Sequence, residues 1–286
     1  MEFHFYKYHA LGNDYIVIDP NKIKVNLSEE NIRLICHRNF GIGSDGILYG
    51  PLFQGNMIHL RILNPDGSEA EKSGNGIRIF SRYLVDAGYV TNKEFHLGTA
   101  GGDVHVELLD VKGSLIRVNM GTVTFQSQQI PVSGPAREVL NEELVIDNHR
   151  LNITCLSIGN PHCVVLCDEI SREKAVALGA AIETHAYFPK KINVQFLKVL
   201  DRNNIQIEIW ERGAGYTLAS GSSSCATASA AYKMGLVGNE INVHMPGGKI
   251  RVDIQKDGQV FMTGPVTQVA KGVFSEDLWE NIIKLA

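Results

Sequence analysis

The 286-residue sequence has few cysteines and no arrangement that would pair them or make them metal ligands. Its five cysteines form no CxxC pair and no evident cluster with histidine, and an odd, dispersed set is typical of reduced thiols. The sequence therefore predicts a cytoplasmic protein. Cys155, Cys163 and Cys167 lie in or beside apolar strand-like runs, where cysteine commonly serves as a small hydrophobic residue.

Long apolar runs and an export signal are also absent. No run approaches the roughly 20 apolar residues that a transmembrane helix needs. The stretch from Met1 to His9 lacks the charged-then-apolar pattern of a signal peptide. We expect neither export nor a membrane partner.

The sequence also has no strong excess of charge of either sign. The net charge of -4 comes from scattered residues, and no Lys/Arg stripe interleaved with aromatics suggests a nucleic-acid partner. The sequence shows no dinucleotide fingerprint and no metal-ligand spacing, so we predict no cofactor and no bound metal. A hydrophobic content of 44% is enough for the core of one or two domains.

What the sequence does contain is a repeat at a spacing of 147 residues. Gly12-Asn13 returns as Gly159-Asn160 and Ser73-Gly74 as Ser220-Gly221, with Val17 and Ile62 matching Val164 and Ile209. Single matches are common by chance in a chain with 28 glycines, but separated segments that share one offset favour two duplicated lobes. Each lobe would offer one hydroxyl to a shared cleft, and two opposed groups are what two-base proton transfer requires.

Strand-like runs dominate both halves, and each half has one strong helix just after its repeated serine. Helices are predicted at 77–87 and 225–234, each ended by a glycine, Gly88 or Gly235, in the C′ position. Strands are predicted at 15–18, 58–63, 104–108, 115–118, 154–158, 163–166, 193–199, 205–210, 250–254 and 260–262.

Most of these strands follow one another with short turns, which predicts an α+β fold with mainly antiparallel, barrel-like sheets. We place an N-terminal lobe at 1–123 and a C-terminal lobe at 124–269, with a crossover at 124–136. Residues 270–286, including a helix at 276–285, should pack back on the first lobe.

The two repeated serines lie at predicted helix N termini, where unsatisfied backbone N–H groups and the helix dipole favour an anion. An ordinary N-cap explains either motif alone, but the matched pair favours two helix ends that grip one carboxylate.

Other polar residues would suit a zwitterionic amino acid, although each alone could be a turn or surface residue. Arg212 can hold a carboxylate bidentately, Glu211 can pair with an ammonium group, and carboxamides supply donors and acceptors. The set is Asn13, Asn64, Asn75, Asn160, His162, Asn193, Glu211 and Arg212.

Seven blocks of the sequence resemble the cofactor-independent diaminopimelate epimerases along nearly the whole chain. They are HALGNDY at 9–15, GIGSDG at 41–46, RILNPDGSE at 61–69, GNGIR at 74–78, GNPHC at 159–163, WERGAG at 210–215 and MTGP at 262–265. The resemblance implies two pseudo-symmetric lobes, each a mainly antiparallel, barrel-like sheet around a central helix, with the active site in the cleft between them. It also implies inversion of an α-carbon without pyridoxal phosphate or metal, from LL- to meso-diaminopimelate, on the route to lysine and peptidoglycan. A homodimer is common in this family, although no exposed apolar stripe in the sequence requires one.

The resemblance further implies a role for each matching residue. Asn64, Asn160, Asn193, Glu211 and Arg212 would hold the distal amino acid end of the substrate. The reacting carboxylate would lie against Asn75, Gly221 and Ser222, with Asn13 and Gly74 completing the substrate-binding set. His162 and Glu211 would tune the acid and the base.

The departure from the family lies at the two catalytic positions, where Ser73 and Ser220 replace the pair of cysteines. A thiol has a pKa near 8.5, whereas a serine hydroxyl is closer to water near 15.7, a gap of roughly seven units. At about 1.36 kcal/mol per unit, this gap corresponds to an upper bound on the order of 10 kcal/mol. Cys225 should not compensate, because five residues beyond Ser220 it lies roughly 140° around the helix.

Three functions remain open. In the first, Ser73 and Ser220 are activated by His162 and Glu211 and the chain is an amino acid epimerase. In the second, Lys72, His162 or Glu211 moves a proton in an isomerase of another carboxylic acid, although Lys72 is more simply a solvated surface lysine. In the third, the chain binds an amino acid without turnover, as a natural homologue or as an epimerase disabled by two Cys-to-Ser changes. Lys72, Ile79, Ser223 and Ser224 look like divergence around a site already settled with serine, which favours a natural sequence.

Overall fold

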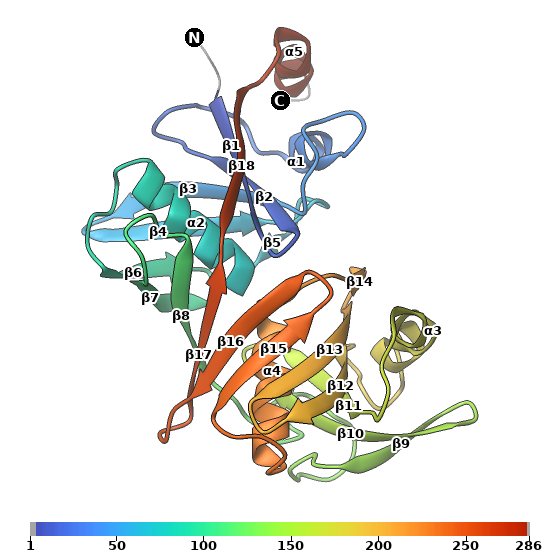
Figure 1. Cartoon of the computed structure of the whole chain (residues 1–286). Coiled ribbons are helices and arrows are strands. Elements are labelled where there is room, and N and C mark those ends of the chain that lie inside the picture. The colour runs from blue at the N-terminus through green and yellow to red at the C-terminus, as the bar shows by residue number, and fades with distance from the viewer. Residues whose placement is uncertain (1–3, 285–286) are drawn as a thin grey trace. The chain divides into compact units, whose positions relative to one another are not determined.

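The computed structural model describes residues 4–284 and separates into two compact units (Figure 1). The first unit runs to Val118 and resumes at Gly264, and the second is Asn119–Thr263. No helix in the described range is long and apolar enough to cross a membrane.

The first unit is a mostly antiparallel sheet with the strand order β18-β1-β2-β3-β4-β6-β7-β8. Two neighbouring pairs, β2–β3 and β4–β6, are parallel, and the short β5 pairs with β4. Its elements are β1 His4–Ala10, β2 Asn13–Ile18, α1 Glu29–Cys36, β3 Ile47–Gln54, β4 Met57–Leu63, β5 Glu69–Ala70, α2 Gly74–Asp86, β6 Glu94–Thr99, β7 Gly102–Leu108, β8 Leu115–Thr122, β18 Thr267–Val273 and α5 Glu276–Lys284.

The second unit repeats this plan with the strand order β9-β10-β11-β12-β13-β15-β16-β17. The parallel pairs, β11–β12 and β13–β15, stand at the same places in the order, and β14 pairs with β13 as β5 does with β4. Its elements are β9 Glu142–Ile146, β10 His149–Ser157, β11 Pro161–Leu166, α3 Arg172–Glu183, β12 Asn193–Asp201, β13 Asn204–Glu211, β14 Gly215–Thr217, α4 Gly221–Lys233, β15 Glu240–Met245, β16 Gly248–Ile254 and β17 Gln259–Pro265.

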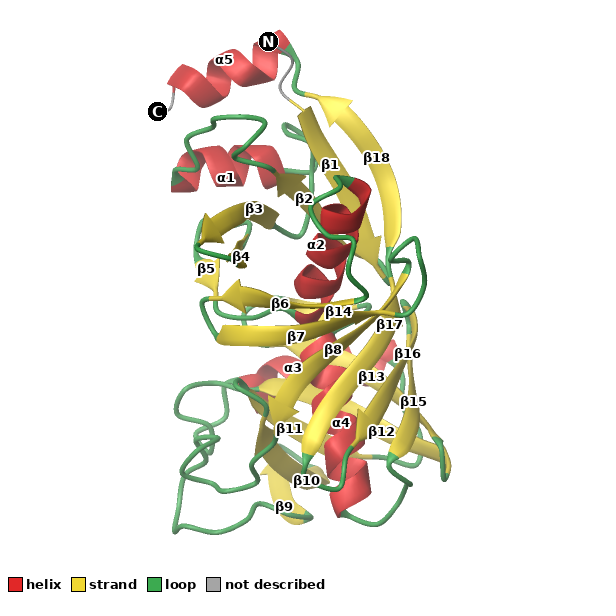
Figure 2. Ribbon diagram, turned by 90° about the vertical axis from the view of Figure 1, so that its left-hand side faces the viewer, coloured by secondary structure: helices red, strands yellow, loops and turns green. Residues whose placement is uncertain are grey.

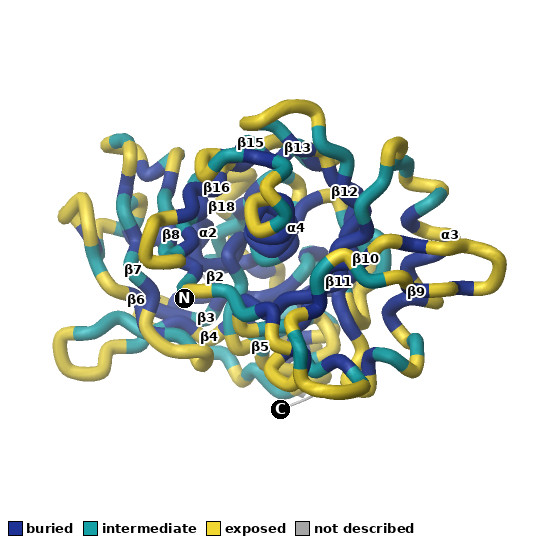
Figure 3. Tube along the Cα trace, turned by 90° about the horizontal axis from the view of Figure 1, so that it is seen from below, coloured by how far each residue is buried: buried dark blue, intermediate teal, exposed yellow. Residues whose placement is uncertain are grey.

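Each sheet wraps one central helix, and the two helices confirm the predicted repeat. Helices α2 and α4 each have 13 residues and begin 147 positions apart. Helix α2 contacts β1, β2 and β3 of its unit, while α4 contacts strands from β10 to β16. The α2 helix is seen against its strands in Figure 2, and the α4 trace is mostly buried in Figure 3.

Both central helices begin three or four residues earlier than the sequence predicted, at Gly74 and Gly221. The reason is the N-cap: the side chain of the preceding serine accepts a backbone N–H of the first turn, which offsets the poor helix propensity of the glycines there. The predicted ends are confirmed, because Gly88 and Gly235 follow the C-caps with positive φ angles of 76° and 73°.

A second helix covers the other face of the sheet in the first unit. On β2, Ile16 and Ile18 pack with Ile32 and Ile35 of α1, since alternate residues of a strand face the same side. The segment after β18 joins this cluster through Phe274 and Ile282. The last residue of the helix predicted at 276–285 lies outside the described residues.

The predicted strands coincide with observed strands, but several elements were not predicted from the sequence. Strand β18 is exposed at nearly every residue, so it has no alternating pattern to reveal it. Helix α1 has only 8 residues, too few for a clear period. The other elements not predicted are β1, β3, β5, β6, β9, β14, β15 and α3.

Candidate active site

In the first unit, Ser73 is the N-cap of α2 and faces a tyrosine. Its Oγ accepts a hydrogen bond from the backbone N–H of Gly76 at 3.0 Å, in an extended conformation with φ −138° and ψ 115°. The hydroxyl of Tyr15, on β2, lies 3.4 Å from the same Oγ. Ser73 is thus both a helix cap and half of a hydroxyl pair.

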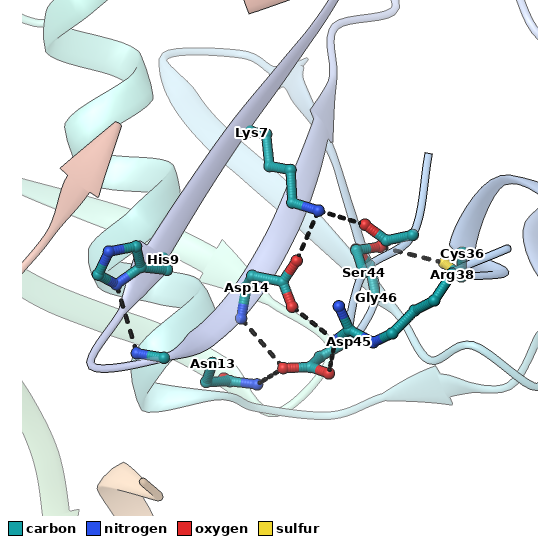
Figure 4. Close-up of polar contacts among 11 residues, drawn as sticks. Lys7, His9, Asn13, Asp14, Cys36, Arg38, Ser44, Asp45 and Gly46 are labelled. Carbon is teal, nitrogen blue, oxygen red and sulfur yellow. Dashed lines mark hydrogen bonds and ion pairs between the residues drawn. The ribbon is translucent and has the colours of Figure 1, made fainter. Parts of the chain in front are cut away.

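Beside Ser73, the orientation of two carboxamides is set by Asp45. The Asp45 carboxylate can only accept, so Asn13 turns its Nδ2 toward it at 2.9 Å (Figure 4). The Asn13 Oδ1 then accepts from Asn75 Nδ2 at 3.0 Å, and Arg78 donates to Asn75 Oδ1 at 2.9 Å. The first turn of α2 therefore carries amides of defined direction.

Asp45 is itself held by charged neighbours. Arg38 bridges Asp45 and Asp14 at 2.6 and 2.8 Å, and Lys7 pairs with Asp14 at 2.8 Å (Figure 4). Burial would raise the pKa of the Asp14 carboxyl, but hydrogen bonds from Arg38 and Lys7 outweigh it and hold that pKa below its usual value. The Asp14 carboxylate therefore stays ionised at neutral pH.

In the second unit, Ser220 is the N-cap of α4 and contacts a carboxylate. Its Oγ donates to Glu211 Oε2 at 3.3 Å and accepts from the backbone N–H of Ser223 at 3.4 Å. The other carboxylate oxygen of Glu211 accepts from Thr217 Oγ1 at 2.8 Å. Ser220 is buried, with an exposed fraction of 5%. A serine proton that can pass to a carboxylate is the requirement for a general base pair.

His162 is fully buried and does not belong to that pair. Its Nε2 lies 2.9 Å from Asn160 Oδ1 and its Nδ1 lies 3.3 Å from Gln195 Oε1. Burial lowers the pKa of His162 to about 3, so the ring is neutral at physiological pH. A neutral imidazole has one N–H, so it can donate to only one of these amides. The Gln195 amide could turn over to serve the other nitrogen, because its partner Ser223 Oγ at 3.0 Å can donate as well as accept.

Residues 147 positions apart occupy equivalent places in the two sites. The contact of Asn13 with Asn75 has its counterpart in Asn160 Nδ2 to Ser222 Oγ at 3.5 Å. The amides point in opposite senses, because Asn13 offers its oxygen to the helix and Asn160 its nitrogen. Two other matching positions differ in chemistry: Glu211 corresponds to Asn64, and His162 corresponds to Tyr15. Ser220 therefore has a carboxylate partner, whereas Ser73 has a phenol.

The residues assigned to the distal end of a substrate lie at the ends of strands: Asn193 begins β12, Arg212 follows β13 and Asn64 follows β4. Asn193 uses both ends of its amide within the chain, donating to Pro161 O at 2.8 Å and accepting from the Arg212 backbone N–H at 3.0 Å. The exposed Arg212 guanidinium donates to Lys190 O at 3.3 Å, and no acidic side chain of residues 4–284 forms an ion pair with it. Asn64 binds Ser68 Oγ at 2.9 Å in the turn after β4.

Four residues of these sites were not singled out from the sequence: Tyr15, Asp45, Gln195 and Thr217. Tyr15 could have been found, because it lies 147 positions before His162. The others act through contacts between separate segments of the chain, and no spacing reveals them. Cys225 is fully buried within α4. In the described part of the chain, no group of three or more His, Cys, Asp and Glu side chains could hold a metal ion.

Comparison with known proteins identifies relatives along the whole chain. The family model for diaminopimelate epimerase matches residues 5–126 and 154–269. A diaminopimelate epimerase 2 from Nostoc sp. is 54% identical over 284 residues, covering 98% of this chain and 99% of its own. The diaminopimelate epimerase of Moorella thermoacetica is 36% identical over 278 residues, covering 96% and 100%.

Solved structures with similar folds are more distant in sequence. A hydroxyproline epimerase from Agrobacterium vitis, with bound trans-4-hydroxy-L-proline, has a TM-score of 0.69 at 13% identity and covers 95% of this chain and 90% of its own. A methylitaconate-delta-isomerase has a TM-score of 0.64 at 12% identity, with 96% and 95% covered. At these identities the likeness is one of fold, and it confirms the predicted fold class.

Proposed function

Because the chain belongs to the diaminopimelate epimerase family, we propose that it inverts one α-carbon of diaminopimelate, converting the LL isomer to the meso isomer without a cofactor. The two family thiols are replaced by the hydroxyls of Ser73 and Ser220. One hydroxyl takes the α-proton and the other returns a proton to the opposite side of the same carbon.

The contact between Ser220 and Glu211 is the observation that carries this proposal. A serine alone is too weak an acid to be deprotonated at neutral pH, by roughly seven pKa units relative to a thiol. With Glu211 Oε2 at 3.3 Å, Ser220 need not become an alkoxide before it reacts. It can take the α-proton while its own proton passes to the carboxylate, so the charge moves from Glu211 toward the substrate in one step.

The helix N termini supply the electrostatic part of the reaction. As the α-proton leaves, negative charge develops on the reacting carboxylate, and the first backbone N–H groups of α2 and α4 have no partner within the helix. We place that carboxylate against the first turns, at Gly74 and Asn75 of α2 and Gly221 and Ser222 of α4. Asn13 and Asn160 then hold the residues of these turns in place.

The distal end of diaminopimelate is the part that distinguishes it from a simple amino acid. Arg212 is exposed, which leaves its guanidinium able to donate two hydrogen bonds to one carboxylate. Asn193 fixes the backbone of Arg212, and Asn64 and Asn160 supply further polar groups. His162 is neutral and bound to Asn160, so we assign it to orienting that amide rather than to removing a proton.

We also propose a homodimer in a reducing compartment such as the cytoplasm. All five cysteines are free thiols, which suits such a compartment. Sedimentation analysis of the purified chain tests the dimer.

The first test is proton NMR of the purified chain with LL-diaminopimelate in deuterated water, beside a Ser73→Cys/Ser220→Cys variant. We expect loss of the α-proton signal and appearance of the meso isomer with both proteins, faster with the thiols. Turnover by the double variant alone would refute epimerase activity of the native serines and leave a site that binds the amino acid. No turnover by either protein would remove diaminopimelate as the substrate.

A further inference from the structure

The hydroxyl of Tyr15 occupies a place beside Ser73 that nothing in the mechanism above uses. It lies 3.4 Å from Ser73 Oγ, a long contact of the kind that catalytic hydrogen bonds often show before substrate is bound. Tyr15 is 7% exposed, so the residue as a whole is largely shielded from bulk water.

The fold holds the Tyr15 ring at this position. Gly46 adopts a φ of +157°, and a Cβ there would lie only 2.8 Å from Tyr15 Cε1 and 2.6 Å from the carbonyl oxygen of Leu63. A glycine at position 46 therefore gives the ring its space. The Ser44 hydroxyl and the Ile16 backbone N–H both donate to the Gly46 carbonyl, at 2.9 and 3.1 Å, which anchors this segment beside β2.

Ser73 lacks a readily ionised proton of its own, and a phenol beside it can supply one. A tyrosine has a pKa near 10, within about two units of a cysteine near 8.5, whereas a serine is several units further away. Ser73 already accepts the Gly76 N–H as a helix cap, so its own proton and one remaining lone pair are left for Tyr15 and a substrate. In the second unit the neighbour of Ser220 is Glu211, which comes from a different position of the repeat than Tyr15 does.

We propose that the Tyr15 phenol is the proton-holding partner of Ser73, as the Glu211 carboxylate is of Ser220, so that an unlike pair of phenol and carboxylate replaces the two thiols. This inference rests on the proposed epimerase function. Tyr15 acts through Ser73 and is therefore a positioning residue for the Ser73 proton.

The protons balance over one inversion. On one side the Cα–H bond breaks, the proton goes to Ser220 Oγ, and the Ser220 proton goes to Glu211. On the other side the Ser73 O–H bond breaks as a new Cα–H bond forms, and Ser73 takes the Tyr15 proton. The cycle leaves a protonated Glu211 and a Tyr15 phenolate, ready for the reverse direction or for reset by exchange with solvent.

The test is Tyr15→Phe, which keeps the ring and removes the hydroxyl. In deuterated water, exchange of the α-proton and inversion are followed separately, starting from LL- and from meso-diaminopimelate. When Ser220 removes the proton, the variant still forms the carbanion but returns a proton poorly from Ser73. The ratio of exchange to inversion should rise for the isomer whose α-proton faces Ser220, and for that isomer only. A loss of stability would slow both processes alike and leave the ratio unchanged.

A matched control and a second background separate chemistry from packing. Tyr89→Phe removes another tyrosine hydroxyl of the same unit, which donates to Asp19 at 2.8 Å, and should leave the ratio unchanged. In a Ser73→Cys background the thiol holds its own proton, so Tyr15→Phe should lose little inversion there. In the Ser73 background it should lose on the order of 10²-fold, the low end for a general acid or base.

The outcomes distinguish the two hypotheses. If the unmodified chain shows neither exchange nor inversion, the proposed function fails and the role of Tyr15 fails with it. If the unmodified chain inverts its substrate but Tyr15→Phe leaves the ratio unchanged, or costs the same in both backgrounds, only the role of Tyr15 is overturned.

Discussion

Replacing Glu211 by glutamine tests the base assigned to Ser220 with little change of shape. The glutamine oxygen can keep the 2.8 Å bond from Thr217 Oγ1. The atom facing Ser220 then becomes an NH₂ group, which donates and cannot accept the serine proton. The 3.3 Å contact remains, but no group at this contact can accept the Ser220 proton.

The expected cost follows from the size of general base catalysis. Such a group typically contributes 10²- to 10⁴-fold, or about 2.7 to 5.4 kcal/mol at 1.36 kcal/mol per factor of ten. We expect Glu211→Gln to lower kcat by a factor within this range, while KM changes little. The assay is the rate of meso-diaminopimelate formation at several substrate concentrations, with α-proton exchange in deuterated water as a second readout.

The split between kcat and KM decides between two roles for Glu211, since the same carboxylate could instead pair with the distal ammonium of the substrate. That role predicts a raised KM with kcat nearly unchanged, and such a result would refute the base assignment. Glu208→Gln is the matched control, because Glu208 lies on the same strand, is 8% exposed and accepts one hydroxyl, that of Tyr216, at 2.7 Å. This control should keep its activity.

Three further predictions concern Arg212 at the distal end of the substrate, the buried His162, and Gly46 beside the Tyr15 ring. Arg212→Ala should weaken binding of diaminopimelate by about 1.5 to 3 kcal/mol, the usual value for a hydrogen bond to a charged group, and leave a monoamino acid little affected. Equal losses in calorimetric titrations would rule out the distal role. The pKa of His162 is about 3 in the folded chain against about 6.5 when exposed, so its contribution to stability is complete above pH 6.5 and is lost as the pH falls toward 3. Urea unfolding should show the free energy of unfolding falling by up to about 1.4 kcal/mol per pH unit in that window. His162→Gln should remove this contribution of one titrating group to the pH dependence. Gly46→Ala should cost about 1 to 3 kcal/mol, because its Cβ would meet Leu63 O and the Tyr15 ring. An unchanged melting temperature would contradict this account.

The repeat is the part of the fold that the sequence predicted best. Matching segments such as Ser73-Gly74 and Ser220-Gly221 share one offset, and the structure places both serines as N-caps of helices of equal length. Alternating or β-branched runs also predicted most of the inner strands. Strand β18 was not predicted, since it has no buried face to impose an alternating pattern on its sequence.

The candidate sites were predicted less completely, for a physical reason. The residue types at Asn13, Glu211 and Arg212 suggest polar chemistry, but their partners come from other segments of the chain and cannot be read from spacing. Asp45 reaches Asn13 across 32 positions, and Gln195 reaches His162 across 33. Burial matters equally: His162 resembles an acid-base residue in the sequence, and only its complete burial in the structure shows that its imidazole is neutral.

The two halves differ in the groups that meet the helix ends, and the difference has a chemical consequence. A duplicated backbone supplies the same N terminus twice, which suits the one feature that both sides of a reaction share, the anionic carboxylate. Inversion of the α-carbon requires the two sides to differ, because at any moment one side must accept a proton and the other must give one. Two thiols meet that need by differing only in protonation, whereas two serines cannot, since neither ionises readily. In the proposed mechanism the asymmetry comes from their neighbours, and the positions that differ between the halves place Glu211 beside Ser220 and Tyr15 beside Ser73.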